Sequence, residues 1–551
     1  MGPDQRTMAR NSPGGFIAYI RPEKTGGDSM SARLNMVLFA WGMCLLIFVP
    51  IAETKSPNIL LAISDDHSWP HASAYGSGMV DTPAFDRVAK EGLLFNNAFA
   101  PAPQCSPGRA ALLTGRNIWQ IGEAGSHSSY FPRDFPVYTD LLETEGYLVG
   151  YTGKPWYPGN WWDSGWSRNP AGDEYNEASL EPPHREMSPI DYTENFHKFL
   201  ANRKPGQPFC FWYGAKEPHR EYEPDIGISA GKSLASSEVP GYLPDTPAVR
   251  ADLLDYAVEI EWFDQHLGEM IRILEEAGEL ENTIIVVTGD NGMAFPRAKA
   301  NLYEHGVHVP LAIRWGKIQE PGRRLNTLTS FIDFAPTFLE AAGIDVPDTI
   351  TGQSLLPVFH AEDTDWRQYV LVGRERHSHS RINNWSYPAR AIRTQQWLYI
   401  RNLKPDRWPA GNPNGLHDID GSPSKDLLIE EKESDMIRPY YQLAVSKRPS
   451  EELFDILKDP DCLNNLALDP RYDTIREDLR NQLLSRLKEQ GDPRLNGRGD
   501  IFESYPRMNI MREKYEGFKG FGIYNPEYIQ PDQTLQNEGK TPTRRTIHRS
   551  Y

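Results

Sequence analysis

Short apolar runs that end in polar clusters constrain the fold of this chain more than any other feature. Residues 58–64 (NILLAIS) form one such run, and Asp65 and Asp66 follow it directly. Similar runs occupy residues 93–99, 147–152, 208–213 and 283–288. Continuous apolar runs of this length are typical of parallel strands that are covered on both faces. The carboxyl ends of such strands share one edge of the sheet, where a site is expected.

Helical patterns lie between these runs. Residues 81–92 have helical spacing and end in Gly92, and residues 251–277 read as a long amphipathic helix. The repeated order of strand, polar cluster and helix predicts an α/β fold with a large, mixed but mostly parallel sheet sandwiched by helices. Beyond about residue 365, short alternating segments such as 391–400 precede a helix over 472–490. This pattern predicts a smaller C-terminal subdomain with an antiparallel sheet and a packed helix.

Charge and the N-terminal sequence limit partners and location. The formal net charge of −17 disfavours nucleic acid as a partner, and any site for an anionic substrate must be locally positive. Residues 36–49 are apolar and follow Arg33, while Ala52 precedes a polar segment. We interpret this as a secretion signal of a secreted or periplasmic protein. A single N-terminal membrane anchor is the alternative, although the run is slightly short for a span.

Pairs of side chains with carboxylate or amide oxygens follow two of the predicted strands. Asp65 and Asp66 follow one strand, and Asp290 and Asn291 follow another. Two neighbouring carboxylates repel each other unless a cation or a cationic side chain is close. Oxygen ligands of this kind suit a hard divalent cation. The alternative is that Asp65 caps a helix and Asp66 is solvated.

One cysteine lies in a distinctive motif. Residues 105–109 (CSPGR) match C-x-P-x-R, and residues 110–116 (AALLTGR) continue the pattern. The motif resembles the signature of the type I sulfatases, in which this cysteine is oxidised to formylglycine. A hydrated aldehyde offers one hydroxyl to attack sulfur and a second to expel sulfate. The family commonly has Ser where this chain has Gly108, and a lone cysteine is otherwise often a small buried apolar residue.

The resemblance implies a metal site. Its ligands would be Asp65, Asp66, Asp290, Asn291 and an oxygen of modified Cys105, and the ion would be Ca²⁺, with Mg²⁺ chemically possible. The resemblance also implies a formylglycine-generating enzyme as a maturation partner. Of the other cysteines, Cys44 lies in the N-terminal apolar run, and a disulfide between Cys210 and Cys462 is possible, although Cys210 is better explained as a buried, inert residue.

Four basic residues match catalytic positions of the family. Arg109 lies one helical turn after Cys105 and would brace the diol. Lys154 would contact sulfate, His219 would donate to a sulfate oxygen or protonate the leaving group, and Lys299 would bridge sulfate and the leaving atom. His305 and His308 are expected to be wall residues of the pocket rather than ligands.

One position departs from the family pattern. The family often has G-K-x-H, but the residue two positions after Lys154 is Trp156. Another group or a water would then handle the second hydroxyl. Trp156, with Trp161 and Trp162, either stacks on a sugar face or packs in the core.

The chain resembles the heparan N-sulfatases, or sulfamidases, most closely in residues 217–220 (EPHR), 386–390 (SYPAR) and 452–455 (ELFD). The implied activity is hydrolysis of a sulfamate or sulfate ester on a sulfated glycan such as heparan. Alternatives are an O-sulfatase for another polysaccharide, a formylglycine-dependent phosphodiester or phosphonate hydrolase, and an inactive glycan-binding protein. Residues of the second half were considered for a sugar subsite or, alternatively, as solvated loops: Glu375, Arg376, His377, His379 and Arg390.

These features give predicted domain boundaries. Residues 1–53 would be an N-terminal extension with the signal peptide, 54–364 the catalytic sulfatase domain and 365–495 the C-terminal subdomain. Residues 496–551 would be a polar tail, either wrapped on the protein or disordered. The sequence does not indicate the oligomeric state.

Overall fold

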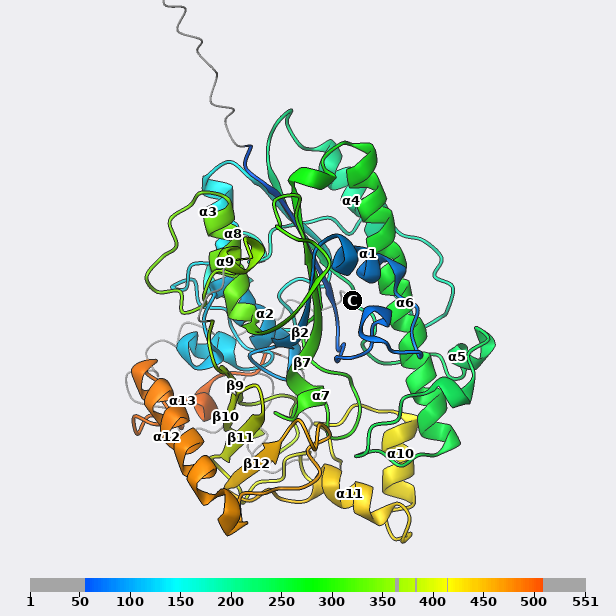
Figure 1. Cartoon of the computed structure of the whole chain (residues 1–551), viewed down its shortest axis with the longest axis vertical. Coiled ribbons are helices and arrows are strands. Elements are labelled where there is room, and N and C mark those ends of the chain that lie inside the picture. Colours follow the sequence, from blue (N-terminus) through cyan, green and yellow to red (C-terminus); the bar gives the residue numbers. More distant parts are fainter. Residues whose placement is uncertain (1–54, 362–365, 382–383, 414, 509–551) are drawn as a thin grey trace, which may run out of the picture. The chain divides into compact units, whose positions relative to one another are not determined.

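Two β-sheets, one of eight strands and one of four, form the framework of residues 55–508 (Figure 1). The computed structural model describes residues 55–361, 366–381, 384–413 and 415–508. The apolar run at residues 36–49 lies outside the described residues, so export remains a prediction. Among the described residues, no helix has both the length and the apolar character needed to cross a membrane.

The larger sheet has eight strands in the order β4-β3-β5-β1-β6-β7-β2-β8. Strand β7 runs antiparallel to both of its neighbours, and the other pairs are parallel. The predicted mixed, mostly parallel sheet is therefore confirmed. The strands are β1 Asn58–Ser64, β2 Leu93–Phe99, β3 Leu148–Gly153, β4 Asp173–Glu174, β5 Phe209–Gly214, β6 Thr283–Gly289, β7 His308–Arg314 and β8 Arg323–Ser330.

Helices bury both faces of this sheet (Figure 1). Side chains alternate along β1, so that Leu61 packs on one face and Leu60 on the other. Helices α2 (Cys105–Thr114), α3 (Tyr138–Thr144) and α8 (Phe334–Ala341) cover the Leu61 face. Helices α1 (Pro83–Glu91), α4 (Tyr192–Ala201) and α6 (Pro247–Glu276) cover the Leu60 face. The polar residues that follow the strands are thereby confined to the sheet edge.

The smaller sheet is antiparallel, in the order β12-β11-β10-β9, as predicted for the second half. Its strands are β9 Val370–Arg374, β10 Ala389–Arg393, β11 Trp397–Asn402 and β12 Glu451–Asp455. Helix α12 (Asp473–Glu489) packs Leu479, Leu483 and Leu487 on one face of this sheet. On the other face the sheet contacts Phe99 and Leu328, which belong to the larger sheet.

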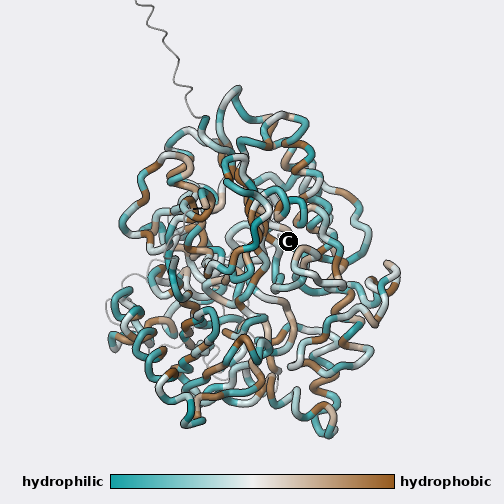
Figure 2. The backbone as a smooth tube through the Cα atoms, viewed as in Figure 1, coloured by the Kyte–Doolittle hydropathy of each residue, from teal (hydrophilic) through white to brown (hydrophobic). Residues whose placement is uncertain are grey.

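Short helices complete the described part of the chain. They are α5 Ile226–Ser229, α7 Glu304–Val307, α9 Leu356–Phe359, α10 Pro423–Glu430, α11 Arg438–Val445 and α13 Ile501–Ser504. Figure 2 shows hydrophobic and hydrophilic stretches alternating along the helices, as expected for helices with one buried face.

Two expectations about the rest of the chain are resolved in part. Cys210 and Cys462 are both buried and unpaired, so the disulfide considered between them is absent. Phe502 and Glu503 are buried, so the tail is packed on the protein at least as far as α13. The predicted domain boundaries remain predictions.

The packing of α12 can be tested by cavity formation. Leu483 is fully buried between α12 and the smaller sheet, so Leu483→Ala should destabilise the fold by about 2–5 kcal/mol. Leu468 is 84% exposed, so Leu468→Ala should change stability by about 0.5 kcal/mol or less. Thermal and urea unfolding of both variants measure the difference. Equal midpoints for the two variants would contradict the described packing.

Candidate active site

The pair Asp65-Asp66 and the pair Asp290-Asn291 come together because the strands that precede them are neighbours. Strands β1 and β6 pair in parallel with Ser64 opposite Gly289, and Asp65 and Asp290 follow these residues. Carboxylate oxygens of Asp65, Asp66 and Asp290 lie within 4.8 Å of one another, and all three side chains are buried. The end of β1 also turns sharply, since Asp66 has a φ of 71°. The predicted acidic cluster therefore forms at the carboxyl edge of the sheet.

Hydrogen bonds hold this cluster but leave two oxygens unused. The Asp66 amide donates to Asp290 Oδ1 at 2.9 Å, and Asn291 Nδ2 donates to Asp66 Oδ1 at 2.7 Å. Among the described residues, Asp65 Oδ1 and Asn291 Oδ1 have no hydrogen-bond partner. A buried acceptor without a partner costs about 1–3 kcal/mol. The three carboxylates and the free amide oxygen fit a hard divalent cation.

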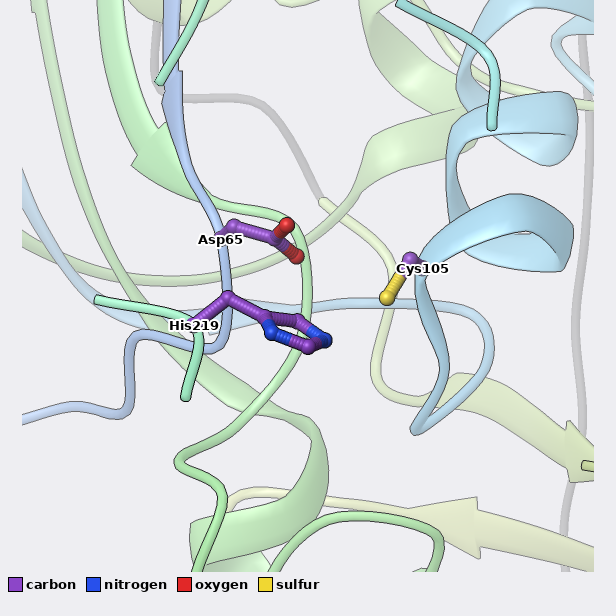
Figure 3. Close-up of side chains that lie close together, drawn as sticks. All are labelled: Asp65, Cys105 and His219. Carbon is purple, nitrogen blue, oxygen red and sulfur yellow. The ribbon is translucent and has the colours of Figure 1, made fainter. Parts of the chain in front are cut away.

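Cys105 is the first residue of α2 and faces this cluster. Its side chain is 1% exposed. Its Sγ lies within 4.8 Å of a carboxylate oxygen of Asp65 and of a ring nitrogen of His219 (Figure 3). Helix α2 packs so closely that a Cβ on Gly108 would lie 3.2 Å from the carbonyl oxygen of Asp290. Burial raises the pKa of the Cys105 thiol well above its usual value, and Asp65 adds to this while Lys154 opposes it.

Arg109 connects the cysteine helix to the acidic cluster. Its guanidinium is fully buried and donates to Asp290 Oδ2 at 2.8 Å and to the Lys154 carbonyl at 2.6 Å. Nη2 lies 3.9 Å from Asp65 Oδ1 and has no hydrogen-bond partner among the described residues. This free donor remains available beside Asp65.

Two lysines complete the charge balance. Lys154 Nζ pairs with Asp65 Oδ2, and Lys299 Nζ pairs with Asp66 Oδ2 at 2.5 Å. Burial would lower the pKa of Lys154, but the negative groups around it, Asp65 first among them, together outweigh burial and raise the pKa. With Arg109, three cations balance the three carboxylates. A bound divalent cation would therefore make the site positive, as an anionic substrate requires.

The pKa values of two buried carboxyl groups of the cluster shift in opposite directions. Burial raises the pKa of Asp290 to about 7, and the charge of nearby Asp65 adds to this effect. Burial alone would raise the pKa of Asp65, but the surrounding basic groups, with Lys154 and His219 first, together outweigh burial and hold the pKa below its usual value. A divalent cation bound beside Asp65 and Asp290 would favour the ionised form of both carboxyl groups.

His219 presents one ring nitrogen to the site. Its Nδ1 lies 2.7 Å from the Arg220 carbonyl, which can only accept, so Nδ1 carries a proton. Nε2 lies 3.8 Å from Asp66 Oδ2, and the side chain is 37% exposed. Arg220 is anchored by two hydrogen bonds to Asp252. His219 is therefore both oriented and accessible.

Trp156 packs in the core instead of facing a sugar. Its indole is completely buried against Phe131, and Nε1 donates to the Ser106 carbonyl at 3.0 Å. The sugar-stacking interpretation is therefore wrong for Trp156, because no face of its ring is accessible. The indole instead holds the first turn of α2, which carries Cys105. Trp162, by contrast, is half exposed.

The sugar subsite considered in the second half is also mostly a buried framework. Arg390 pairs with Glu375 and Asp492, each at 2.8 Å, and Arg376 donates to the carbonyls of Tyr505 and Pro506. Glu375, Arg376 and Arg390 are fully buried, so they cannot act as a solvated subsite. The ring of His308 stacks on Trp69, and the ring of His305 stacks on His71.

One charged group at the site, Asp420, was not predicted from the sequence. Asp420 Oδ2 lies 3.0 Å from Lys299 Nζ, and its side chain is 27% exposed. No predicted strand precedes Asp420, so the rule that polar residues gather at strand ends did not indicate it. The acidic pattern HDID at residues 417–420 is its only sequence signal.

Comparison with known proteins gives a consistent result. A family model described as Sulfatase matches residues 57–344, and one described as N-sulphoglucosamine sulphohydrolase, C-terminal, matches residues 297–438. A solved structure of a protein in complex with its substrate, D-glucosamine-2-N,6-O-disulfate, is similar with a TM-score of 0.58 at 22% identity. The similarity covers 80% of this chain and 99% of that one.

Two curated relatives have similar identity. N-sulphoglucosamine sulphohydrolase of Homo sapiens is 29% identical, covering 82% of this chain and 93% of that protein. An ulvan-active sulfatase of Formosa agariphila is also 29% identical, covering 80% of this chain and 82% of that protein. Because the sulfatase model spans more than half of the chain and includes the acidic cluster, Cys105 and the basic residues around them, this protein belongs to the sulfatase family.

Proposed function

We propose that this sulfatase removes sulfate groups from a sulfated glycan and that Cys105, as formylglycine, provides the nucleophile. The observation that carries this proposal is the grouping of Cys105 Sγ with Asp65 and His219 beside three buried carboxylates. When Cys105 is converted, the hydrated aldehyde supplies one hydroxyl that attacks sulfur and another that later expels sulfate. The conversion requires a formylglycine-generating enzyme as a partner.

We assign Asp65, Asp66, Asp290 and Asn291 as ligands of Ca²⁺, together with an oxygen of modified Cys105. The free oxygens of Asp65 and Asn291 support this assignment. When bound, the cation polarises a sulfate oxygen and favours the ionised form of the attacking hydroxyl. The lysines that contact Asp65 and Asp66 would then be free to turn toward an anionic substrate.

The basic residues divide into two groups around the cluster. Arg109 and Lys154 lie at the Asp65 side, where the free Arg109 Nη2 can donate to a nucleophilic oxygen. Lys299 lies at the Asp66 side and can donate to a leaving atom. His219 lies close to both Asp65 and Asp66, and its Nε2 can donate when both ring nitrogens carry a proton. Fixed donors of this kind stabilise the charge that develops as the bond to sulfur breaks.

The favoured substrate is an N-sulfated glucosamine at the end of a heparan-type chain. The match of residues 297–438 to the C-terminal region of N-sulphoglucosamine sulphohydrolases supports this choice. The human relative, named for the same activity, aligns with 82% of this chain. An O-sulfate on another polysaccharide is the second candidate, favoured by the equal identity to an ulvan-active sulfatase. Turnover of N-sulfoglucosamine against O-sulfated sugars tests this choice.

The first test is chemical. The peptide that contains Cys105 should have a mass about 18 Da below that of the unmodified thiol, because conversion replaces sulfur by oxygen and removes two hydrogens. Mass spectrometry of the active protein measures this difference. Full activity in a protein with an intact Cys105 thiol would contradict the proposed nucleophile.

Substitution separates this cysteine from the others. Cys105→Ala should abolish sulfate release and leave the melting temperature nearly unchanged, since only the reacting group is lost. Cys210→Ala is the matched control, because Cys210 is equally buried but lies within β5 and away from the acidic cluster. The control should retain most of its activity. Appreciable activity in Cys105→Ala would exclude Cys105 as the nucleophile.

Replacement by serine tests the second half of the reaction. Cys105→Ser has one hydroxyl, which can attack once but cannot expel sulfate by forming an aldehyde. We expect a stable sulfated enzyme after incubation with substrate, detected as an added mass on the same peptide. Repeated turnover by Cys105→Ser would contradict the role of the second hydroxyl.

Removal of cations tests the metal site. Chelation with EDTA should abolish sulfate release, and Ca²⁺ should restore it. Ca²⁺ at about 100 times its dissociation constant should also stabilise the fold by about 2.7 kcal/mol, visible as a higher melting temperature. Asn291→Ala, which removes one free oxygen, should reduce this shift. Unchanged activity and melting temperature in EDTA would contradict a bound cation.

A further inference from the structure

We infer that Asp420 determines substrate preference by accepting a hydrogen bond from the N–H of an N-sulfate, so that sulfamates are preferred over sulfate esters. This inference rests on the proposed sulfatase reaction at Cys105 and adds the choice between its two substrate classes. It concerns a residue outside the acidic cluster and outside the matched catalytic positions.

The position of Asp420 supports this role. Lys299 Nζ lies 2.5 Å from Asp66 Oδ2 and 3.0 Å from Asp420 Oδ2, so one ammonium group joins the two carboxylates. His219 Nε2 lies 3.8 Å from the same Asp66 oxygen. Asp420 is therefore joined through Lys299 to the Asp66 side of the site, where the proposed mechanism places the leaving atom.

Asp420 is also accessible, unlike the metal-site carboxylates. Its side chain is 27% exposed, whereas those of Asp65, Asp66 and Asp290 are 2% exposed or less. The oxygen that contacts Lys299, Oδ2, is buried, so the exposed part of the side chain lies away from Lys299. Among the described carboxylates that contact Lys299, Asp420 is thus the more accessible to a substrate.

The segment that carries Asp420 is held rigidly. Asp418 Oδ2 accepts from Nη2 of both Arg374 and Arg381 at 2.7 Å, and all three side chains are buried. Lys425 Nζ donates to the carbonyl of Ile419 at 2.7 Å. A carboxylate fixed by its neighbours discriminates better than a mobile one, because little ordering is needed when substrate binds.

The chemistry of the two substrate classes differs at the atom between carbon and sulfur. A sulfamate carries an N–H there, which can donate to a carboxylate. A sulfate ester carries an oxygen there, which has no hydrogen to donate. This oxygen and the carboxylate are both hydrogen-bond acceptors, so they repel each other. A site built to bind an N–H rejects an analogue without it, because the acceptor is left unpaired.

The carboxylate also suits the leaving group. When the S–N bond breaks, its electron pair stays on nitrogen, which takes the proton released by the attacking hydroxyl and leaves as an amine. The amine then gains a second proton from solvent and becomes an ammonium ion. Positive charge near nitrogen is stabilised by Asp420, and an alcohol leaving group gains nothing comparable.

The test compares substrate ratios in two variants of the full, calcium-loaded protein. Asp420→Asn keeps the shape of the side chain, and Asp426→Asn removes an equal charge at an exposed position of α10. The substrates are N-sulfoglucosamine, glucosamine 6-O-sulfate and an aryl sulfate. We expect kcat/KM for N-sulfoglucosamine to fall by about 10- to 100-fold in Asp420→Asn, with the O-sulfates changed by about threefold or less. Asp426→Asn should change neither.

Further controls distinguish failure of the Asp420 inference from failure of the sulfatase mechanism at Cys105. Asp420→Glu, which keeps the carboxylate, should restore part of the preference for N-sulfoglucosamine, and equal melting temperatures exclude a folding defect. A parallel fall for all substrates in Asp420→Asn would mean that Asp420 only neutralises Lys299, and would overturn the inference. Wild-type turnover of O-sulfates alone would overturn it while leaving the sulfatase mechanism intact. Absence of turnover on every sulfated substrate would overturn both.

Discussion

The mutual neutralisation of buried charges at the end of β1 and β6 is the interaction on which the site depends. Asp65, Asp66 and Asp290 are withdrawn from water, and each is paired with a cationic side chain. Such a cluster is unfavourable unless the geometry is held from outside, because desolvation costs several kcal/mol per ion. Two adjacent parallel strands, packed on both faces, supply this support.

The geometry of the cysteine helix follows from the same constraint. Helix α2 approaches the cluster through Arg109, which bonds Asp290, and through Gly108, which allows contact with the Asp290 backbone. Trp156 Nε1 also holds the first turn of α2 by donating a hydrogen bond to the Ser106 carbonyl. The tryptophan that replaces the family's histidine thus has a packing role, and none of its ring surface is open to a substrate.

The sequence was most informative where local pattern and burial coincide. The ranges predicted for the first two strands agree with β1 and β2, because each is apolar and bounded by polar residues or glycine. Helix α6 begins four residues before the predicted start, since Thr246 caps it and Pro247 occupies its first turn. The antiparallel direction of β7 could not be predicted, because strand order depends on contacts far apart in the chain. Asp420 was missed for the same reason, as Arg374 and Arg381 fix its segment through Asp418.

The burial of Cys105 has a consequence for biosynthesis. Its side chain is 1% exposed and enclosed by the ends of β1 and β6 and by the first turn of α2. A maturation enzyme acting on the folded protein would have to reach this side chain past His219 and the acidic cluster. We therefore expect the proposed oxidation of the thiol to take place on the nascent or unfolded polypeptide, and a molecule that folds first to keep its sulfur. The proportion of active protein in a cell would then depend on the rate of Cys105 oxidation relative to the rate of folding.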